Sequence, residues 1–218
     1  LVAGLHWINR ANALRDCVEP LDRVRIANTH AFLHYLMGDV PAARHAYEYA
    51  LELAQQIHHH YLMLDAHFYL AQSDLLAGEL GAVQDRYEAV MAAYPTRIGP
   101  LSALMLPQAQ VLYQRNRLLD AETTLRDAIT LAHKANITDI LWLACVTLAE
   151  VLLSRGRSVE AAASFSQAYD YARGYRSPMM AAFIGAAEAR FMLRSGQMDR
   201  AAEWALQYEQ MEPGGYHQ

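Results

Sequence analysis

Residues 38–50 read Gly-Asp-Val-Pro-Ala-Ala-Arg-His-Ala-Tyr-Glu-Tyr-Ala. A glycine opens this stretch, and alanine, tyrosine and alanine stand five, nine and twelve residues after it. Offsets of three and four residues lie on one face of an α-helix. Glycine readily adopts the left-handed backbone conformation that closes a preceding helix. The stretch therefore predicts a tight turn at Gly38, followed by a helix that carries a stripe of small and aromatic residues.

The turn residue recurs along the chain at spacings of 40, 38, 40 and 40 residues. The members of this column are Gly38, Gly78, Asn116, Gly156 and Gly196. Asparagine also tolerates the left-handed conformation, so Asn116 fits the same turn. A period in this range is typical of arrays in which one helical hairpin is repeated.

Four other columns align in the same register, although none of them was used to find the period. Seven residues before the turn stand Ala31, Ala71, Ala109, Ala149 and Ala189. Five residues after it stand Ala43, Val83, Ala121, Ala161 and Ala201. Nine residues after it stand Tyr47, Tyr87, Leu125, Phe165 and Ala205, and twelve residues after it stand Ala50, Val90, Ala128, Ala168 and Tyr208. The small columns allow the two helices of each hairpin to approach closely.

A turn glycine followed by alanine, an aromatic residue and alanine, with a small residue seven positions before the turn, resembles the tetratricopeptide (TPR) motif. A HEAT-like array shares the period but is not expected to carry this stripe. The lengthened period near 40 residues resembles the sensor region of MalT-like, LuxR-type ATP-dependent transcription regulators. The resemblance implies an all-α fold, a right-handed superhelical solenoid of TPR-like helical hairpins with about eleven helices.

The same register divides the chain, which we expect to form a single TPR-like domain over residues 1–218. The expected segments are an orphan second helix of a preceding repeat over 1–17, five hairpins over 18–59, 60–95, 96–136, 137–174 and 175–211, and a tail over 212–218. The orphan helix suggests a fragment of a longer protein. Pro107 falls inside the first helix of the third hairpin, where we expect it to kink or split that helix.

Composition narrows the classes of partner. The formal net charge is −5, and Lys134 is the only lysine among 18 basic residues that are spread along the chain. We therefore expect no direct contact with nucleic acid, which requires a basic stripe. Cys17 and Cys145 stand far apart, which suits a reduced, cytoplasmic protein, and we expect both to be buried. No stretch is apolar over the length that a membrane span needs.

The sequence shows no recognisable catalytic or metal-binding motif. The histidines include His30 and His34 on one helix face and the run His58–His60, without the further ligands that a zinc site requires. No phosphate-binding glycine loop precedes Lys134, and no Gly-x-Ser-x-Gly element is present. The sequence therefore predicts no enzyme activity, no cofactor and no metal.

The first helix of each hairpin is expected to line a concave binding groove. Three columns, at ten, six and three residues before the turn, supply its candidate residues. They are Asn28, Phe68, Phe32, Gln72, Gln110, Glu150, Arg190, Tyr35 and Tyr113. The apolar members at this spacing could equally belong to the core between repeats.

These features lead to two functional hypotheses. The first is the effector-sensing or oligomerisation region of a bacterial LuxR-type transcription regulator, for which the resemblance implies a nucleotide-binding module upstream and a DNA-binding helix-turn-helix downstream. The second is a stand-alone TPR adaptor whose groove receives a peptide or helix of a partner protein. In either case a protein, a peptide or a small-molecule effector occupies the groove, and the open end of the orphan helix adds self-association as a third alternative.

Overall fold

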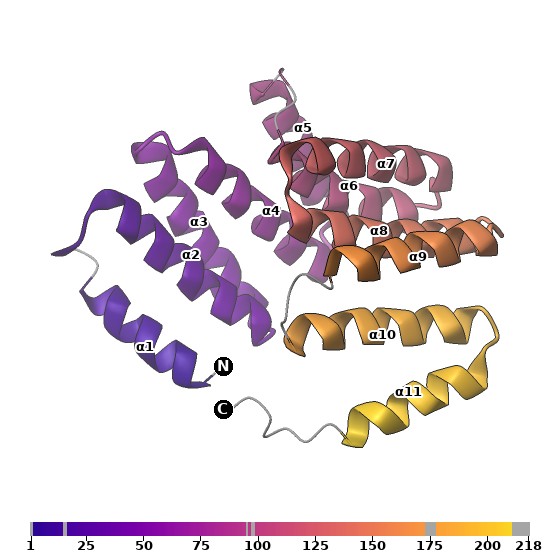
Figure 1. Ribbon diagram of the computed structural model, residues 1–218. Coiled ribbons are helices and arrows are strands. Elements are labelled where there is room, and N and C mark those ends of the chain that lie inside the picture. Colours follow the sequence, from indigo (N-terminus) through magenta and orange to yellow (C-terminus); the bar gives the residue numbers. More distant parts are fainter. Residues whose placement is uncertain (1, 15–16, 95, 97–98, 173–177, 211–218) are drawn as a thin grey trace. The chain divides into compact units, whose positions relative to one another are not determined.

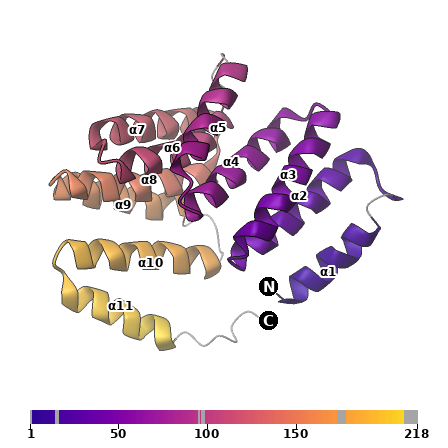
Figure 2. The same ribbon diagram turned by 180° about the vertical axis from the view of Figure 1, so that it is seen from behind.

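A computed structural model describes residues 2–14, 17–94, 96, 99–172 and 178–210 of the chain. Over these residues the regular structure consists of eleven α-helices and no strand (Figures 1 and 2). The helices are α1 (Val2–Ala13), α2 (Pro20–Leu36), α3 (Val40–Gln56), α4 (His60–Leu76), α5 (Leu80–Ala93), α6 (Leu101–Gln114), α7 (Leu118–Ala135), α8 (Thr138–Ser154), α9 (Ser158–Ala172), α10 (Pro178–Arg194) and α11 (Met198–Gln210). The all-α prediction and the number of helices are confirmed.

The turn column has the backbone conformation that the sequence predicts. Every member has a positive φ, between 59° and 79°: Gly38, Gly78, Asn116, Gly156 and Gly196. At the first turn, the N–H groups of Gly38 and Asp39 donate to the carbonyl oxygens of Tyr35 and His34 at 3.0 Å. These bonds satisfy carbonyl groups that the end of helix α2 would otherwise leave without partners.

Two turns between hairpins use the same conformation without glycine. His58, between α3 and α4, has φ 52°, and Asn136, between α7 and α8, has φ 54°. Helices α3 and α4 also begin with side-chain caps. The carboxylate of Asp39 accepts a hydrogen bond from the Ala42 N–H at 3.2 Å, and Nδ1 of His59 accepts one from the Leu62 N–H at 3.3 Å.

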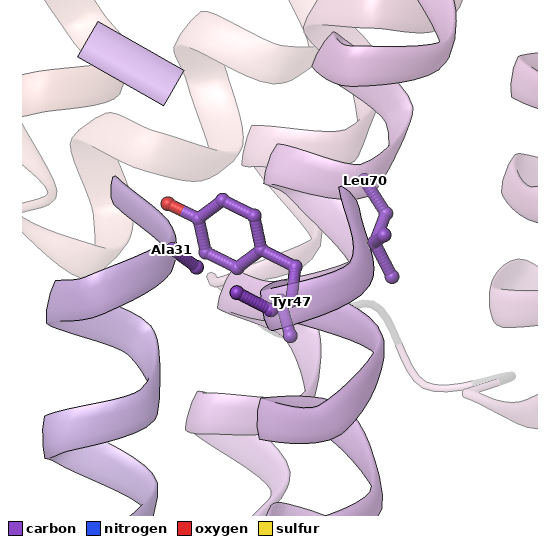
Figure 3. Packing of buried hydrophobic residues seen from close by; sticks show 5 residues of the cluster. Ala31, Tyr47 and Leu70 are labelled. Carbon is purple, nitrogen blue, oxygen red and sulfur yellow. The ribbon is translucent and has the colours of Figure 1, made fainter. Parts of the chain in front are cut away.

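The small-residue columns form the core. The columns seven residues before and five residues after the turn are buried in all five repeats. Tyr47, from the aromatic column, is fully buried and lies between Ala31 on α2 and Leu70 on α4 (Figure 3). Alanine on α2 therefore makes room for a large ring on α3, which explains why small and aromatic columns alternate in the sequence.

Three local expectations are corrected by the structure. Helix α1 ends at Ala13, earlier than the predicted segment 1–17. Helix α6 runs unbroken through Pro107, which is buried, so the expected split is wrong; proline removes one backbone hydrogen bond, and the packed surroundings hold the helix together. Cys17 is exposed, because it lies beyond the end of α1, whereas Cys145 is buried as expected.

The chain divides into two compact units, Leu1–Arg115 and Asn116–Gln218, and the boundary falls at the turn of the third predicted hairpin. In the first unit α2 packs on α3, α3 on α4, and α4 on both α5 and α6. In the second unit α7, α8, α9, α10 and α11 pack in chain order. The fold is an all-α solenoid of helical hairpins. Within the described residues, no helix combines the length and apolar character that a membrane crossing requires.

Candidate functional site

The first helices of the first unit present a face of aromatic and polar side chains. On α2 this face carries Asn28, Phe32 and Tyr35, at the spacing of one helix face. On α4 the equivalent face carries Asp65, Phe68, Tyr69 and Gln72. We call these seven residues the first-helix face.

Aromatic rings from three helices meet at Tyr69. The Tyr69 ring is stacked on that of Tyr47, with ring centroids 4.9 Å apart and an angle of 3° between the planes. Phe32, Tyr35 and Phe68 approach Tyr69 edge to face at 5.4, 5.6 and 4.9 Å. The cluster fixes the positions of α2, α3 and α4 relative to each other, and the rings of Phe32 and Tyr35 remain only partly buried.

A carboxylate lies beside these rings. Nδ2 of Asn28 donates a hydrogen bond to Oδ2 of Asp65 at 3.1 Å, which links α2 to α4. Burial raises the pKa of Asp65 from 3.8 to about 6, because water no longer solvates its charge fully. Among the described residues, no arginine, lysine or histidine forms an ion pair with Asp65.

Two buried oxygen atoms of α2 and α3 have unused hydrogen-bonding capacity. Oδ1 of Asn28 and the hydroxyl oxygen of Tyr47 are buried and have no hydrogen-bond partner. Burial raises the pKa of the Tyr47 hydroxyl far above its ordinary value, and the nearby Tyr69, Asp65 and Tyr35 raise it further. A buried polar atom without a partner is unusual in a folded protein and is one of the features that mark a ligand site.

Among the described residues, two other buried carboxylates are neutralised by arginine. Asp74 is fully buried, and its two oxygens lie 3.2 Å from the guanidinium of Arg44 and 2.9 Å from that of Arg86. In the second unit, the nearly buried Glu122 forms ion pairs with three arginines: Arg126, Arg155 and Arg157. Both clusters join neighbouring helices, so we assign them to stability and not to binding.

The predicted groove residues are distributed over both units. Asn28, Phe32, Tyr35, Phe68 and Gln72 come together on the first-helix face, although Phe68 and Gln72 are each only 8% exposed. Residues Gln110 and Tyr113 lie on α6, where Oε1 of Gln110 is buried without a hydrogen-bond partner.

In the second unit, the column six residues before the turn brings together Glu150 on α8 and Arg190 on α10. Their charged groups lie 3.8 Å apart, and the Arg190 side chain is 66% exposed. This ion pair is accessible and weak. The first unit therefore holds the more strongly organised part of the predicted site.

A separate hollow of about 350 Å³ lies between α1, α2 and α3. Its lining residues are Asn12, Ala27, His30, His34, Ala42, His45, Ala46 and Tyr49. The Nε2 atoms of His30 and His34 are 3.3 Å apart, and Nδ1 of His34 lies 3.6 Å from the carboxylate of Asp39. In the part of the chain that the structure describes, no three histidine, cysteine or acidic side chains are arranged to hold a metal ion.

Sequence reasoning missed Asp65. It stands thirteen residues before the Gly78 turn, one helical turn before the column that contains Asn28 and Phe68. That signal was available, because a helix face extends in steps of three and four residues. The column holds only one carboxylate, so no pattern across repeats drew attention to it.

Helical hairpins with a left-handed turn, packed small columns and a partly buried first-helix face define a TPR-like helical-repeat protein. The family model described as the MalT-like TPR region matches residues 20–218, so the chain belongs to that family. No curated protein sequence matches the chain.

Solved structures share the fold at low sequence identity. BtubC from P. vanneervenii has a TM-score of 0.63 and 15% identity, over 97% of this chain and 91% of that protein. Aspartyl phosphate phosphatase F from Bacillus subtilis has a TM-score of 0.62 and 13% identity, over 94% of this chain and 64% of that one. A putative kinesin light chain from Podosopora anserina, with TPR-like repeats, has a TM-score of 0.56 and 18% identity, over 87% and 94%.

Proposed function

We propose that the chain is a non-catalytic scaffold that binds a protein or peptide on its first-helix face. We further propose that it serves as the effector-sensing region of a bacterial, cytoplasmic transcription regulator of the LuxR type. The observation that carries the binding role is the first-helix face itself. It combines partly buried rings with a carboxylate that has no cationic partner and an amide oxygen that has no hydrogen-bond partner.

Such a surface suits a polypeptide ligand. Partly exposed Phe32 and Tyr35 offer contact area with few rotatable bonds, so little conformational entropy is lost when a ligand packs on them. The polar atoms between them supply directional hydrogen bonds that fix the ligand's register. Repeat proteins commonly recognise extended segments or helices along such faces.

The binding role can be tested by selecting peptides on the 218-residue chain from a displayed random library. We expect binders whose affinity falls about tenfold or more for Tyr35→Ala, since truncation of a central aromatic contact removes at least about 1.4 kcal/mol. Leu119→Ala is the control: Leu119 lies on α7, in the other unit, and is 63% exposed. Binders equally sensitive to both changes would place the binding surface elsewhere.

The regulator role rests on the family to which the chain belongs. In this role, binding of the effector would shift the parent protein from a resting state towards an assembling state. The coding sequence on both sides of residues 1–218 tests this role directly. A phosphate-binding module upstream and a helix-turn-helix downstream are expected, and a parent gene with neither would contradict it.

A stand-alone adaptor is the second candidate, and the same first-helix face favours it, since docking requires no output domain. The two roles differ in their consequence. In a regulator, the selected peptide should change transcription from a reporter when expressed with the full parent protein, whereas in an adaptor it should only compete with the natural partner.

A further inference from the structure

We propose that the first-helix face binds a lysine or arginine side chain of its partner, with Asp65 as the counter-charge. This inference deepens the proposed function and rests on it, because it requires a polypeptide on the face. The site comprises Asp65 and Asn28, which provide oxygen atoms, and the rings of Phe32 and Tyr35, which provide apolar contact.

Asp65 differs from the other buried carboxylates of this protein in the partners that surround it. Asp74 is buried against two arginines, and Glu122 is buried against three. Asp65 is also largely withdrawn from water, yet within the described residues it has an amide as its hydrogen-bond partner and no cation. A carboxylate taken out of water without a counter-charge is unfavourable. A cation supplied by a partner would neutralise the charge of Asp65, as arginine neutralises the charges of Asp74 and Glu122.

The acceptor atoms at Asp65 suit a ligand group with several donors. A guanidinium carries five N–H donors and an ammonium carries three, so either needs several oxygen atoms at once. Beside the Asp65 carboxylate lies Oδ1 of Asn28, which is buried and has no hydrogen-bond partner. An anionic or apolar ligand group would leave these acceptors unsatisfied, whereas a cationic donor group would use them.

The rings of Phe32 and Tyr35 provide apolar surface on α2. Phe32 and Tyr35 lie one helical turn apart on α2, with planes inclined by only 15° and centroids 6.5 Å apart. Both rings are partly accessible. Lysine and arginine pack their aliphatic stems on apolar surface while the charged head reaches a polar group. A cation near an aromatic face gains further electrostatic attraction.

The test begins with a random dodecapeptide library displayed on phage and selected on the immobilised chain. We expect lysine or arginine to be enriched at one fixed position of the selected peptides. Fluorescence anisotropy with one such peptide then gives the affinity of the wild-type chain. Replacement of that basic residue by glutamine should weaken binding about 10- to 100-fold, as expected for loss of a hydrogen bond between charged groups.

The same pair of peptides is then measured against Asp65→Asn and against Asp85→Asn. Asp85 is an exposed residue of α5 and serves as the control. If the inference is right, the two peptides differ by less than about threefold on Asp65→Asn and keep their full difference on Asp85→Asn, because coupling is confined to residues in contact. Circular dichroism of each variant shows that it is folded.

The outcomes separate the inference from the function on which it rests. Selected peptides that contain no enriched basic residue, or that keep their full preference on Asp65→Asn, overturn the inference and leave the binding role intact. A library that yields no binder above background overturns both.

Discussion

Asp65→Asn should make the protein more stable while removing part of its binding site. The pKa of Asp65 rises from 3.8 to about 6 in the folded chain. Between these two values the folded state binds more protons than the unfolded state, so the free energy of unfolding falls as pH rises through this window. Above pH 6 the full free-energy cost of burying the charged Asp65 carboxylate remains. Each pKa unit is worth about 1.4 kcal/mol, which sets an upper limit of about 3 kcal/mol.

Solvent screening lowers this limit, because Asp65 is not fully buried. We expect Asp65→Asn to raise the free energy of unfolding by about 1–2 kcal/mol at pH 7.5, and we call this increase the gain. At pH 4.5 the folded carboxyl is mostly protonated and resembles an amide, so the gain should shrink to about a third of its neutral value. Urea denaturation at both pH values measures the gain. Hydrogen exchange of peptides from α4 locates it in the first unit.

Asp85→Asn, on the exposed side of α5, should change the free energy of unfolding by less than about 0.5 kcal/mol. The reasoning is refuted if Asp65→Asn destabilises the chain at pH 7.5, or if its effect does not depend on pH. Either result would mean that the Asp65 charge is already compensated in the folded protein. Confirmation would show that the protein keeps the Asp65 charge although this charge lowers its stability, as is common for residues that serve binding.

Four further substitutions test the packing and the buried charges. Asp74→Asn should destabilise the first unit by about 3 kcal/mol in urea denaturation, because two arginines lose their buried counter-charge. Gly81→Ala should raise stability by about 0.5–1 kcal/mol, since a methyl group there meets nothing, whereas Gly185→Ala should lower it by about 1 kcal/mol because the methyl group collides with the Trp204 indole. Burial, aided by the nearby Arg86, lowers the pKa of His67 to about 4, so on acidification the unfolded state takes up the proton first. Between pH 6.5 and pH 4 the wild-type chain should therefore lose about 2 kcal/mol of stability, and His67→Gln should abolish this loss.

Each of these predictions has its own control. Asp120→Asn breaks an exposed ion pair with Arg117 and should cost less than about 1 kcal/mol; an equal loss for Asp74→Asn would contradict the buried-pair argument. Trp204→Ala combined with Gly185→Ala should reverse the sign of the glycine effect. For His67→Gln, an unchanged acid profile would show that this imidazole is solvated.

The turn column shows how much of the fold could be predicted from the sequence. Glycine and asparagine signal a left-handed turn through their own chemistry, so Gly38 and its equivalents were found from local residues and a period. His58 adopts the same conformation without such a signal. Its turn is closed by backbone hydrogen bonds, including that from the His59 N–H to the Ala54 carbonyl oxygen at 3.0 Å, and no residue type signals these bonds in the sequence.

The candidate site was predicted less completely, for a physical reason. Repetition reveals positions that all repeats share, such as the buried alanine columns, whereas binding depends on what differs between repeats. Asp65 is a single carboxylate in its column, and its character comes from burial and from the partner it lacks. Neither property can be deduced from the sequence of one helix. Phe32 and Tyr35, by contrast, were found because their spacing places them on one face of α2.

The central claim is that ligands bind along the first helices of the first unit. Hydrogen–deuterium exchange of the 218-residue chain, with and without a selected dodecapeptide, tests it most directly. The account predicts slower exchange in α2 and α4, residues 20–36 and 60–76, and little change in the second helices α3 and α5. Protection confined to α3 and α5 would contradict the account, because the ligand would then lie on the opposite side of the hairpins.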